Sequence, residues 1–200
     1  MVYNDLNVSI SDVFFKASML NSDFSTSNAS VAAPRQTIQH WLHPPSGRLK
    51  VNVDAAWDPS IPRAGVGAVI RDSQGRIIAS SYKNILSTGG SIFVEATTFL
   101  FGIELVITMQ VQDFILEEDA LIIVSDLKAK KIALAPYGKC VDSAIHLFQD
   151  LVCEVVHTPR INNKLADSLA HLGMNFGASV LFVGHVPNAC SHIAIFELSV

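Results

Sequence analysis

Four acidic residues spread along the sequence are of a type that could hold a divalent cation: Asp54, Glu95, Asp126 and Asp167. Carboxylate oxygens are the ligands that Mg²⁺ prefers, and a loose set of them suits this ion better than histidine or cysteine does. A single carboxylate is more often a solvated side chain or a helix cap. The elements that position these residues therefore decide whether they form one site.

Asp54 and Glu95 lie on elements whose apolar patterns are clear. Asp54 belongs to LKVNVDAAW, which alternates as a half-buried strand does over 49–57, and its side chain is on the polar side. Glu95 lies near the start of a helix predicted over 92–109, on the side of the apolar stripe. An inward carboxylate must be paired, hydrogen-bonded or bound to a metal, because burying it alone costs several kcal/mol. The alternative for Glu95 is a first-turn glutamate that leans into water.

Asp126 and Asp167 have ordinary alternatives as well. Asp126 ends DALIIVSD, a continuous apolar run that is typical of a strand buried on both faces. Ligand sites of open α/β sheets gather at the carboxyl ends of such strands, although Asp126 could equally cap a following helix. Asp167 lies on a predicted helix, opposite its leucines, where a solvated side chain is the ordinary interpretation. His157 is near the end of the preceding strand, where a lone histidine is more often structural or merely exposed.

The order of the predicted elements is that of a mixed sheet. Three strands come first, and the turn RDSQGR suits a short hairpin, so these strands form an antiparallel meander. Later strands follow helices and extend the sheet in parallel, which gives an α/β fold. Gly65 and Gly67 lie inside the second strand, where a glycine often marks the close approach of a backbone or a ligand. The predicted strands are 49–57, 64–72, 75–83, 119–126 and 153–160, and the predicted helices are 92–109, 127–134, about 140–151 and 162–173, the last ending at Gly173.

Length and composition predict one domain with a substantial core. The chain has 200 residues, of which 50% are hydrophobic. The formal net charge of −4 gives no global basic field, so a nucleic-acid partner would need a local patch and a metal. We expect a polar, poorly ordered segment at 1–44, a domain at 45–175, and a C-terminal extension at 176–200 that adds a strand or a packing arm.

The remaining sequence features concern the compartment. Cys140, Cys153 and Cys190 have no metal-binding spacing and are odd in number, so we expect reduced thiols in an intracellular protein, nuclear or cytoplasmic. The first residues lack a secretion signal, and the longest apolar stretch is interrupted by Glu95 and Glu104. Neither export nor a membrane span is predicted. The chain is expected to be a monomer.

Several motifs, in this order, resemble the type 1 ribonuclease H domain, and more narrowly the plant reverse-transcriptase-like ribonuclease H proteins related to retroelements. They are VNVDAAW, EA at the start of a helix, IVSD, and HTPRINNKLADSLAHLG. The segments WLHPPSGRLKVNVDAAW and AGVGAVIRDSQGRIIAS are also similar to the family. The similarity covers about residues 45–175. It implies the ribonuclease H-like fold, a five-stranded mixed sheet of an antiparallel meander plus two parallel strands, flanked by helices.

The resemblance also implies a metal-dependent chemistry. In that family two Mg²⁺ ions, for which Mn²⁺ can substitute, are held by four carboxylates, which correspond here to Asp54, Glu95, Asp126 and Asp167. Two such ions activate a water and stabilise the leaving oxygen of a phosphodiester. The implied reaction is hydrolysis of the RNA strand of an RNA–DNA hybrid, leaving a 5′-phosphate, with recognition through groove shape and 2′-hydroxyls.

Three further residues have roles implied by the same resemblance. His157 matches a mobile histidine that assists proton transfer or product release, and Asn163 matches an asparagine four residues before the last aspartate, an expected substrate contact. Lys128 is the expected phosphate contact, although a short basic run is usually a solvated helix face. The first helix is expected to cover the polar face of the first strand, so that Asp54 and Glu95 meet with a cation between them.

Departures from the family pattern leave a second interpretation open. Ala55 stands where many members have glycine, and Asp126 is followed by LKAKK in place of a small residue. The sequence also shows no separate basic segment among its predicted helices. This lack and the acidic net charge favour a domesticated, noncatalytic domain with a nucleic-acid-binding or interaction role. Retention of four acidic positions favours the enzyme, because a carboxylate cluster without metal repels itself. A 3′–5′ exonuclease is disfavoured, because such enzymes have two acidic residues one position apart on the first strand.

Overall fold

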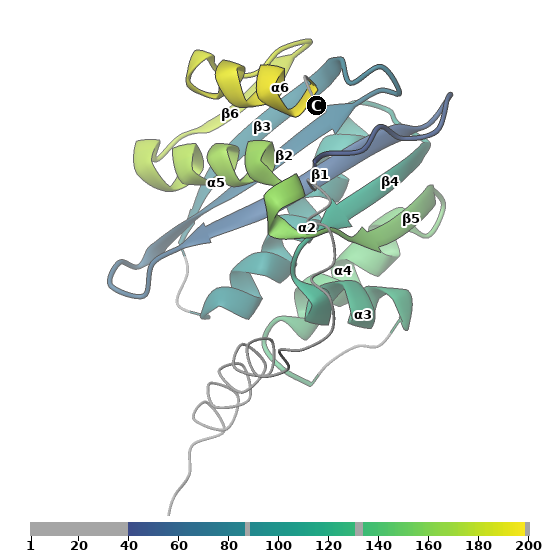
Figure 1. Cartoon of the computed structure of the whole chain (residues 1–200). Helices are drawn as coiled ribbons and strands as arrows, with labels where there is room; N and C mark the ends of the chain where they lie inside the picture. The colour runs from purple at the N-terminus through teal and green to yellow at the C-terminus, as the bar shows by residue number, and fades with distance from the viewer. Residues whose placement is uncertain (1–39, 87–88, 131–133, 199–200) are drawn as a thin grey trace, which may run out of the picture. The chain divides into compact units, whose positions relative to one another are not determined.

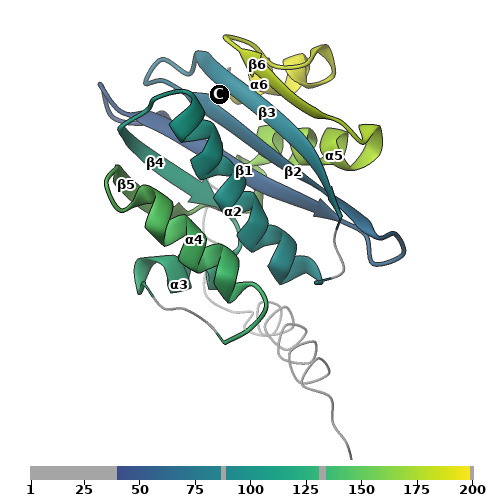
Figure 2. The same cartoon turned by 180° about the vertical axis from the view of Figure 1, so that it is seen from behind.

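The computed structural model describes residues 40–86, 89–130 and 134–198, which fold into one sheet with helices on both faces (Figures 1 and 2). The predicted mixed α/β sheet is confirmed, but it has six strands instead of the predicted five, in the order β5-β4-β1-β2-β3-β6. The strands are β1 (Leu49–Trp57), β2 (Arg63–Arg71), β3 (Ile77–Leu86), β4 (Asp113–Glu118), β5 (Val152–His157) and β6 (Ser179–Val183).

The first three strands form the predicted antiparallel meander. In the turn between β2 and β3, the Gly75 amide donates to the Asp72 carbonyl oxygen over 2.9 Å. Gly75 has a φ of 77°, a conformation that residues with a side chain rarely adopt. The Asp72 carboxylate also accepts the Arg76 amide. These local bonds explain why the hairpin could be read from RDSQGR alone.

Helical crossovers extend the sheet beyond β1, where β4 and β5 run parallel to it. Figure 2 shows α2 and α4 on one face of the sheet, and Figure 1 shows α5 on the other. The main core lies under α2, where Val51 and Val53 of β1 belong to one apolar cluster with Phe99 and Ile103. The helices are α2 (Ser91–Thr108), α3 (Leu121–Lys128), α4 (Gly138–Phe148), α5 (Lys164–Phe176) and α6 (Ser191–Leu198), with 3₁₀ turns η1 (Arg160–Asn162) and η2 (Asn188–Cys190).

The fourth strand is not where the sequence analysis placed it. The strand predicted over 119–126 is wrong, because β4 ends at Glu118 and most of the predicted run forms α3. Two adjacent charged residues, Glu117 and Glu118, are buried in β4 and concealed it in the sequence. The apolar run that follows forms a short helix, and periodicity alone cannot assign such a run to strand or helix.

Helix α5 is longer than predicted. It continues past Gly173 to Phe176, and Gly177, with a φ of 65°, ends it. Gly173 is a packing position instead, since a Cβ atom there would lie 2.7 Å from the carbonyl oxygen of Lys83 in β3. The prediction that Gly173 ends the helix is therefore wrong, and the glycine serves the close contact of α5 with the sheet.

Both flanks of the predicted domain contribute to its packing. The C-terminal extension supplies the expected added strand, because β6 pairs antiparallel with β3. The adjoining Cys190 belongs to an apolar cluster with Leu165 and Leu169 of α5. Trp41, in the segment expected to be poorly ordered, is buried. Residues 1–39 of that segment lie outside the described residues.

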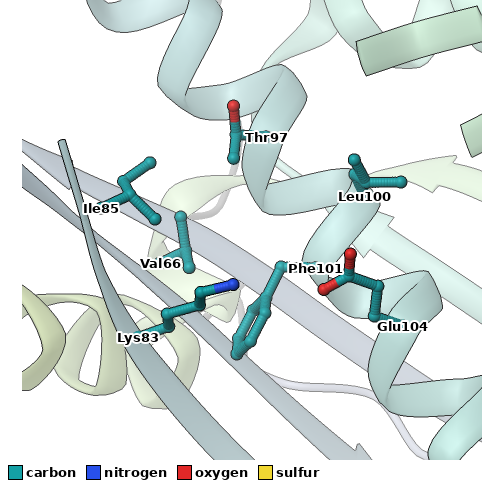
Figure 3. A pocket seen from close by; sticks show the side chains of 7 residues that line it. All are labelled: Val66, Lys83, Ile85, Thr97, Leu100, Phe101 and Glu104. Carbon is teal, nitrogen blue, oxygen red and sulfur yellow. The ribbon is translucent and has the colours of Figure 1, made fainter. Parts of the chain in front are cut away.

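Helix α2 is the one helix in the described ranges with the length and hydropathy of a membrane span, and half of it is buried within the fold. A hollow of about 180 Å³ lies beside it, between α2 and the β2–β3 hairpin (Figure 3). Its lining is mainly apolar and contains none of the predicted carboxylates. The lining residues are Val66, Lys83, Ile85, Thr97, Leu100, Phe101 and Glu104.

The predicted close approach at Gly65 and Gly67 is confirmed, and the approaching element is the backbone of α5. A Cβ atom at Gly67 would lie 2.4 Å from both the Ala166 carbonyl oxygen and the Ala170 amide nitrogen. Overpacking of this kind costs about 1–3 kcal/mol, so Gly67→Ala should lower the free energy of unfolding by at least about 1 kcal/mol. Urea denaturation measures this change. An unchanged urea midpoint would show that the backbone of α5 does not pack closely against residue 67 of β2.

Candidate functional site

Three carboxylates from different elements converge at one end of the sheet. They belong to Asp54 of β1, Glu95 of α2, and Asp119, which directly follows β4. One oxygen of each lies within 4.8 Å of the others. Asp54 is only 1% exposed, and Glu95 and Asp119 are partly buried. The predicted meeting of Asp54 with Glu95 is present, and Asp119 stands where Asp126 was expected.

The register of the sheet brings Asp54 and Asp119 together. The parallel ladder of β1 and β4 ends at the pair Asn52 and Glu117. Each carboxylate follows its member of that pair by two residues, so both lie at the same level beyond the ladder. Their separation is therefore set by the pairing of two strands and not by a flexible loop.

Glu95 reaches the cluster from the other layer of the fold. Helix α2 packs on the face of β1 that presents Val53, because a Cβ atom at Gly102 would lie 2.5 Å from the Val53 Cγ1 atom. Asp54 is on the opposite face, which α5 covers. The expectation that the first helix covers the polar face of the first strand is therefore wrong. Glu95 meets Asp54 beyond the end of the β1–β4 ladder, where the sheet no longer separates the layers.

Burial and mutual repulsion disfavour the charged forms of these carboxyls. Burial raises the pKa of Asp54 to about 8, and the neighbouring charge of Asp119 adds to the shift. Burial also raises the pKa of Glu95 to about 8, with contributions from Asp54 and Asp119. The pKa of Asp119 is raised by burial, although the Arg160 charge opposes this. A bound cation would relieve both the desolvation and the repulsion.

Glu118 is a further acidic side chain beside the cluster. It is fully buried in β4, and among the described residues neither of its carboxyl oxygens has a hydrogen-bond partner. Burial raises its pKa well above the ordinary value, and the charges of Glu95 and Asp119 add to that effect. The Oε2 atom of Glu95 is also buried without a partner in this part of the chain. Unpaired buried oxygens are rare, and these would be satisfied by an ion or its waters.

Asp167 lies at the edge of the cluster and is paired with an arginine. The Arg160 Nη2 atom donates to the Asp167 Oδ1 atom over 3.0 Å. Asp167 is outside the set within 4.8 Å, although its charge contributes to the raised pKa of Asp54. The hydrogen bond with Asp167 raises the pKa of Arg160, and the charge of Asp54 acts in the same direction. Arg160 is 69% exposed, so this cation stands at the mouth of the cluster.

Asn163 holds Asp54 in place. Its side chain is fully buried, and its Nδ2 atom donates to the Val53 carbonyl oxygen over 2.7 Å and to the Asp54 Oδ2 atom over 3.2 Å. The Ala55 amide donates to the other oxygen, Oδ1, over 2.8 Å. Both oxygens of Asp54 are thus oriented by the protein. Asn163 was predicted as a substrate contact, but in the structure it is buried and bonds Asp54.

The remaining predicted residues are distributed differently. His157 ends β5 and is exposed beside the cluster, with its Nε2 atom 3.1 Å from the Asp119 carbonyl oxygen. Lys128 is exposed at the end of α3, and its phosphate contact stays a prediction. Asp126 lies within α3 and accepts a hydrogen bond of 3.1 Å from the Tyr137 hydroxyl. Asp126 is therefore outside the convergent set, and Asp119, which follows β4, occupies the place that was expected for it.

Sequence reasoning missed Asp119 and Arg160. Asp119 is followed by Ala120, which is the small residue expected after the third carboxylate, so the departure noted after Asp126 disappears. The pair Asp119–Ala120 was the signal in the sequence that could have identified this aspartate. It was missed because the apolar residues of α3 that follow were taken for a strand. Arg160 lies within HTPRINNK but was given no role. Only the fold shows that its side chain reaches Asp167, seven residues further along the chain.

Comparison with solved structures gives several ribonucleases H. The chain is similar to RNase H1 from the halophilic archaeon Halobacterium salinarum, with 22% identity over 65% of this chain and 99% of that chain and a TM-score of 0.60. It is similar to the N-terminal RNase H domain of a Mycobacterium tuberculosis protein, with 19% identity over 65% and 95% of the two chains and a TM-score of 0.58. A third is LC11-RNase H1, isolated from compost and solved in complex with an RNA/DNA hybrid, with 21% identity over 64% and 98% and a TM-score of 0.57.

These likenesses show a shared fold, with its mixed sheet and its flanking helices. No curated protein matches the sequence. Residues 52–173, more than half of the chain, match the family described as reverse transcriptase-like. That span includes Asp54, Glu95, Asp119 and Asp167. The chain therefore belongs to the reverse transcriptase-like family, and its domain has the type 1 ribonuclease H-like fold.

Proposed function

We propose that this domain is a divalent-cation-dependent endoribonuclease that hydrolyses the RNA strand of RNA–DNA hybrids. The observation that supports the proposal is the convergence of Asp54, Glu95 and Asp119 within 4.8 Å, on this fold. The substrate class is extended from LC11-RNase H1, whose structure contains an RNA/DNA hybrid.

The donor set fits a hard divalent cation. The three convergent groups are all carboxylates, and Asp167 adds another at the edge. Such ligands suit Mg²⁺ or Mn²⁺ better than softer metals. The buried oxygens of Glu95 and Glu118 that lack partners are consistent with a cation or its waters beside them. Two cations held by these carboxylates would supply an activated water and stabilise the leaving oxygen.

The surrounding residues of the chain would orient the reactants. Asn163 and the Ala55 amide fix both oxygens of Asp54. His157 is exposed beside Asp119, where its imidazole would accept or release a proton near the departing group. Arg160 is exposed and already attracted to the cluster, so a substrate phosphate would find a guanidinium partner there.

A noncatalytic nucleic-acid-binding or interaction domain is the second candidate. The net charge of −4 favours it, because an acidic protein does not attract a polyanion over long range. The repulsion among the clustered carboxylates argues against it. Burying these carboxylates together costs free energy, and in a domain that binds no cation nothing offsets that cost. Cleavage assays separate the two.

Asparagine substitutions should separate the two assignments of the third carboxylate. Asp54→Asn and Asp119→Asn should each lower kcat/KM for a labelled RNA–DNA hybrid by at least about 100-fold in Mg²⁺, because each removes a charge from the convergent set. Asp126→Asn is the matched control and should stay near wild type, since Asp126 bonds only Tyr137 among the described contacts. Loss of activity in Asp126→Asn with retention in Asp119→Asn would reverse the assignment. A wild-type protein that cleaves no hybrid would support the noncatalytic candidate.

Arg160→Gln should weaken substrate binding more than turnover. Loss of one phosphate contact is expected to raise KM and to reduce the slope of log kcat/KM against log salt concentration by about 1. Arg76→Gln is the matched control, because Arg76 is also exposed and paired with an aspartate, in the β2–β3 turn away from the cluster. An Arg160 variant with unchanged KM and salt slope would remove Arg160 from the substrate interface.

Without divalent cations, the Tm should fall as the pH rises from about 5 to about 8.5. The pKa values of Asp54 and Glu95 are raised in the folded state to about 8, so the folded state binds protons more tightly than the unfolded state. The resulting stabilisation is present at low pH and is lost as the pH rises through the folded-state values. Mg²⁺ should raise the Tm more at the high end of this range, because it binds deprotonated carboxylates.

Thermal denaturation with and without millimolar Mg²⁺ measures both effects. Asp54→Asn should flatten the pH dependence and reduce the shift caused by Mg²⁺. A Tm that is independent of pH, together with no shift in Mg²⁺, would contradict the description of the cluster as a buried cation site.

A further inference from the structure

Glu197 of the C-terminal helix α6 lies in a buried polar network behind the cluster. It is 5% exposed, and its Oε2 atom accepts a hydrogen bond of 2.5 Å from the Arg71 Nη1 atom. Its Oε1 atom accepts the Leu165 backbone N–H of α5 over 3.2 Å. One carboxylate from the extension therefore pairs with a buried arginine and caps the first turn of α5.

Arg71 connects this carboxylate to the central strand. It is 1% exposed, and its Nη2 atom donates to the Asn52 Oδ1 atom of β1 over 2.8 Å. Its guanidinium lies 3.7 Å from the centre of the Trp41 ring, and the Trp41 Nε1 atom also donates to the Asn52 Oδ1 atom. The Oδ1 atom of Asn52, two residues before Asp54, thus accepts hydrogen bonds from both Arg71 and Trp41.

The network continues to β4. The Asn52 Nδ2 atom donates to the Glu117 Oε2 atom over 2.9 Å, and the Glu117 Oε1 atom pairs with Lys50 over 2.6 Å. The buried charges are balanced, with Arg71 and Lys50 against Glu197 and Glu117. Removing Glu197 alone would leave Arg71 buried without its counterion.

The position of this network relative to the cluster is regular. Asn52 and Glu117 form the last pair of the β1–β4 ladder, and Asp54 and Asp119 follow them by two residues each. Leu165, in the first turn of α5, lies between Asn163, which precedes the helix and holds Asp54, and Asp167. Each strand or helix that supplies an aspartate to the site is therefore bonded to the network within two residues of that aspartate.

We propose that Glu197 is a positioning residue for the cation site, so that the C-terminal extension completes the active domain. This proposal rests on the proposed cation-dependent function. Glu197 lies outside residues 52–173, the part that matches the family. Through Arg71 and the α5 amide, its carboxylate fixes the spacing of β1, β4 and α5, and with it the spacing of Asp54, Asp119 and Asp167.

Glu197→Gln in the full chain tests the proposal, because glutamine keeps the shape and the acceptor oxygen but removes the charge. The Tm without cations should fall by about 10 °C, since a buried arginine is left unpaired. The Mg²⁺ concentration that gives half of the maximal Tm increase should rise about tenfold, as for other residues that orient metal ligands. Hydrogen exchange at the Leu165 amide should also become faster.

Glu154→Gln is the matched control. Glu154 pairs with Arg48 over 2.6 Å but is 57% exposed and lies at the edge strand β5. It should change neither the Tm by more than about 2 °C nor the Mg²⁺ midpoint. Arg71→Gln combined with Glu197→Gln removes both charges, and its Tm should recover relative to Glu197→Gln, because no buried charge is left alone.

The outcomes separate this proposal from the proposed function. The Mg²⁺ titration needs no substrate, so a wild-type protein that binds Mg²⁺ without cleaving a hybrid would overturn the function and leave this test intact. A lower Tm with an unchanged Mg²⁺ midpoint would overturn the proposal, since Glu197 would then only stabilise the fold. If Glu197→Gln does not fold, Glu197→Asp replaces it, because the shorter carboxylate keeps the charge and cannot reach both partners. An unchanged Mg²⁺ midpoint in Glu197→Asp would likewise overturn the proposal.

Discussion

The mutual repulsion of buried carboxylates is the constraint on which this site depends. Asp54, Glu95 and Asp119 are brought within 4.8 Å of one another, and Glu118 is buried beside them. Folding must place these groups together against both desolvation and like-charge repulsion. The pKa values of Asp54 and Glu95 are raised because desolvation and like charges both disfavour the ionised carboxylates. A divalent cation reverses the sign of the interaction, which is why the geometry favours a cation-dependent function over a purely structural one.

A cluster of this kind needs a rigid support, and the fold provides it in two ways. The central strands are fixed by apolar packing under α2 and by the close contact of α5 at Gly67 and Gly173. The buried network around Arg71 then joins β1, β4 and α5 through charged hydrogen bonds. Charged groups are costly to bury unless each has a partner. Because the ion pairs of this network join different elements, the network sets the spacing of those elements as well as holding them together.

Much of the fold could be predicted from the sequence because its signals are local. The alternation in LKVNVDAAW gave β1 at its observed bounds, and the turn RDSQGR gave the β2–β3 hairpin. The fourth strand could not be read in the same way. DFILEE contains two glutamates that the fold buries, one in a network and one beside the cluster, and neither environment is visible in the letters. The error in β4 carried over to the site, since Asp126 was chosen in place of Asp119.

The sequence by itself determined the elements that follow from periodicity and turn chemistry and the mixed order of the sheet, and it favoured an inward direction for Glu95. Only the tertiary structure decided which aspartate follows β4, which helix covers the polar face of β1, and that Asn163 supports Asp54. It also decided that Glu197, remote in the chain, is the counterion of Arg71. The physical reason is that periodicity reports which side of an element is buried, whereas the partner of a buried charge is set by packing between elements far apart in sequence.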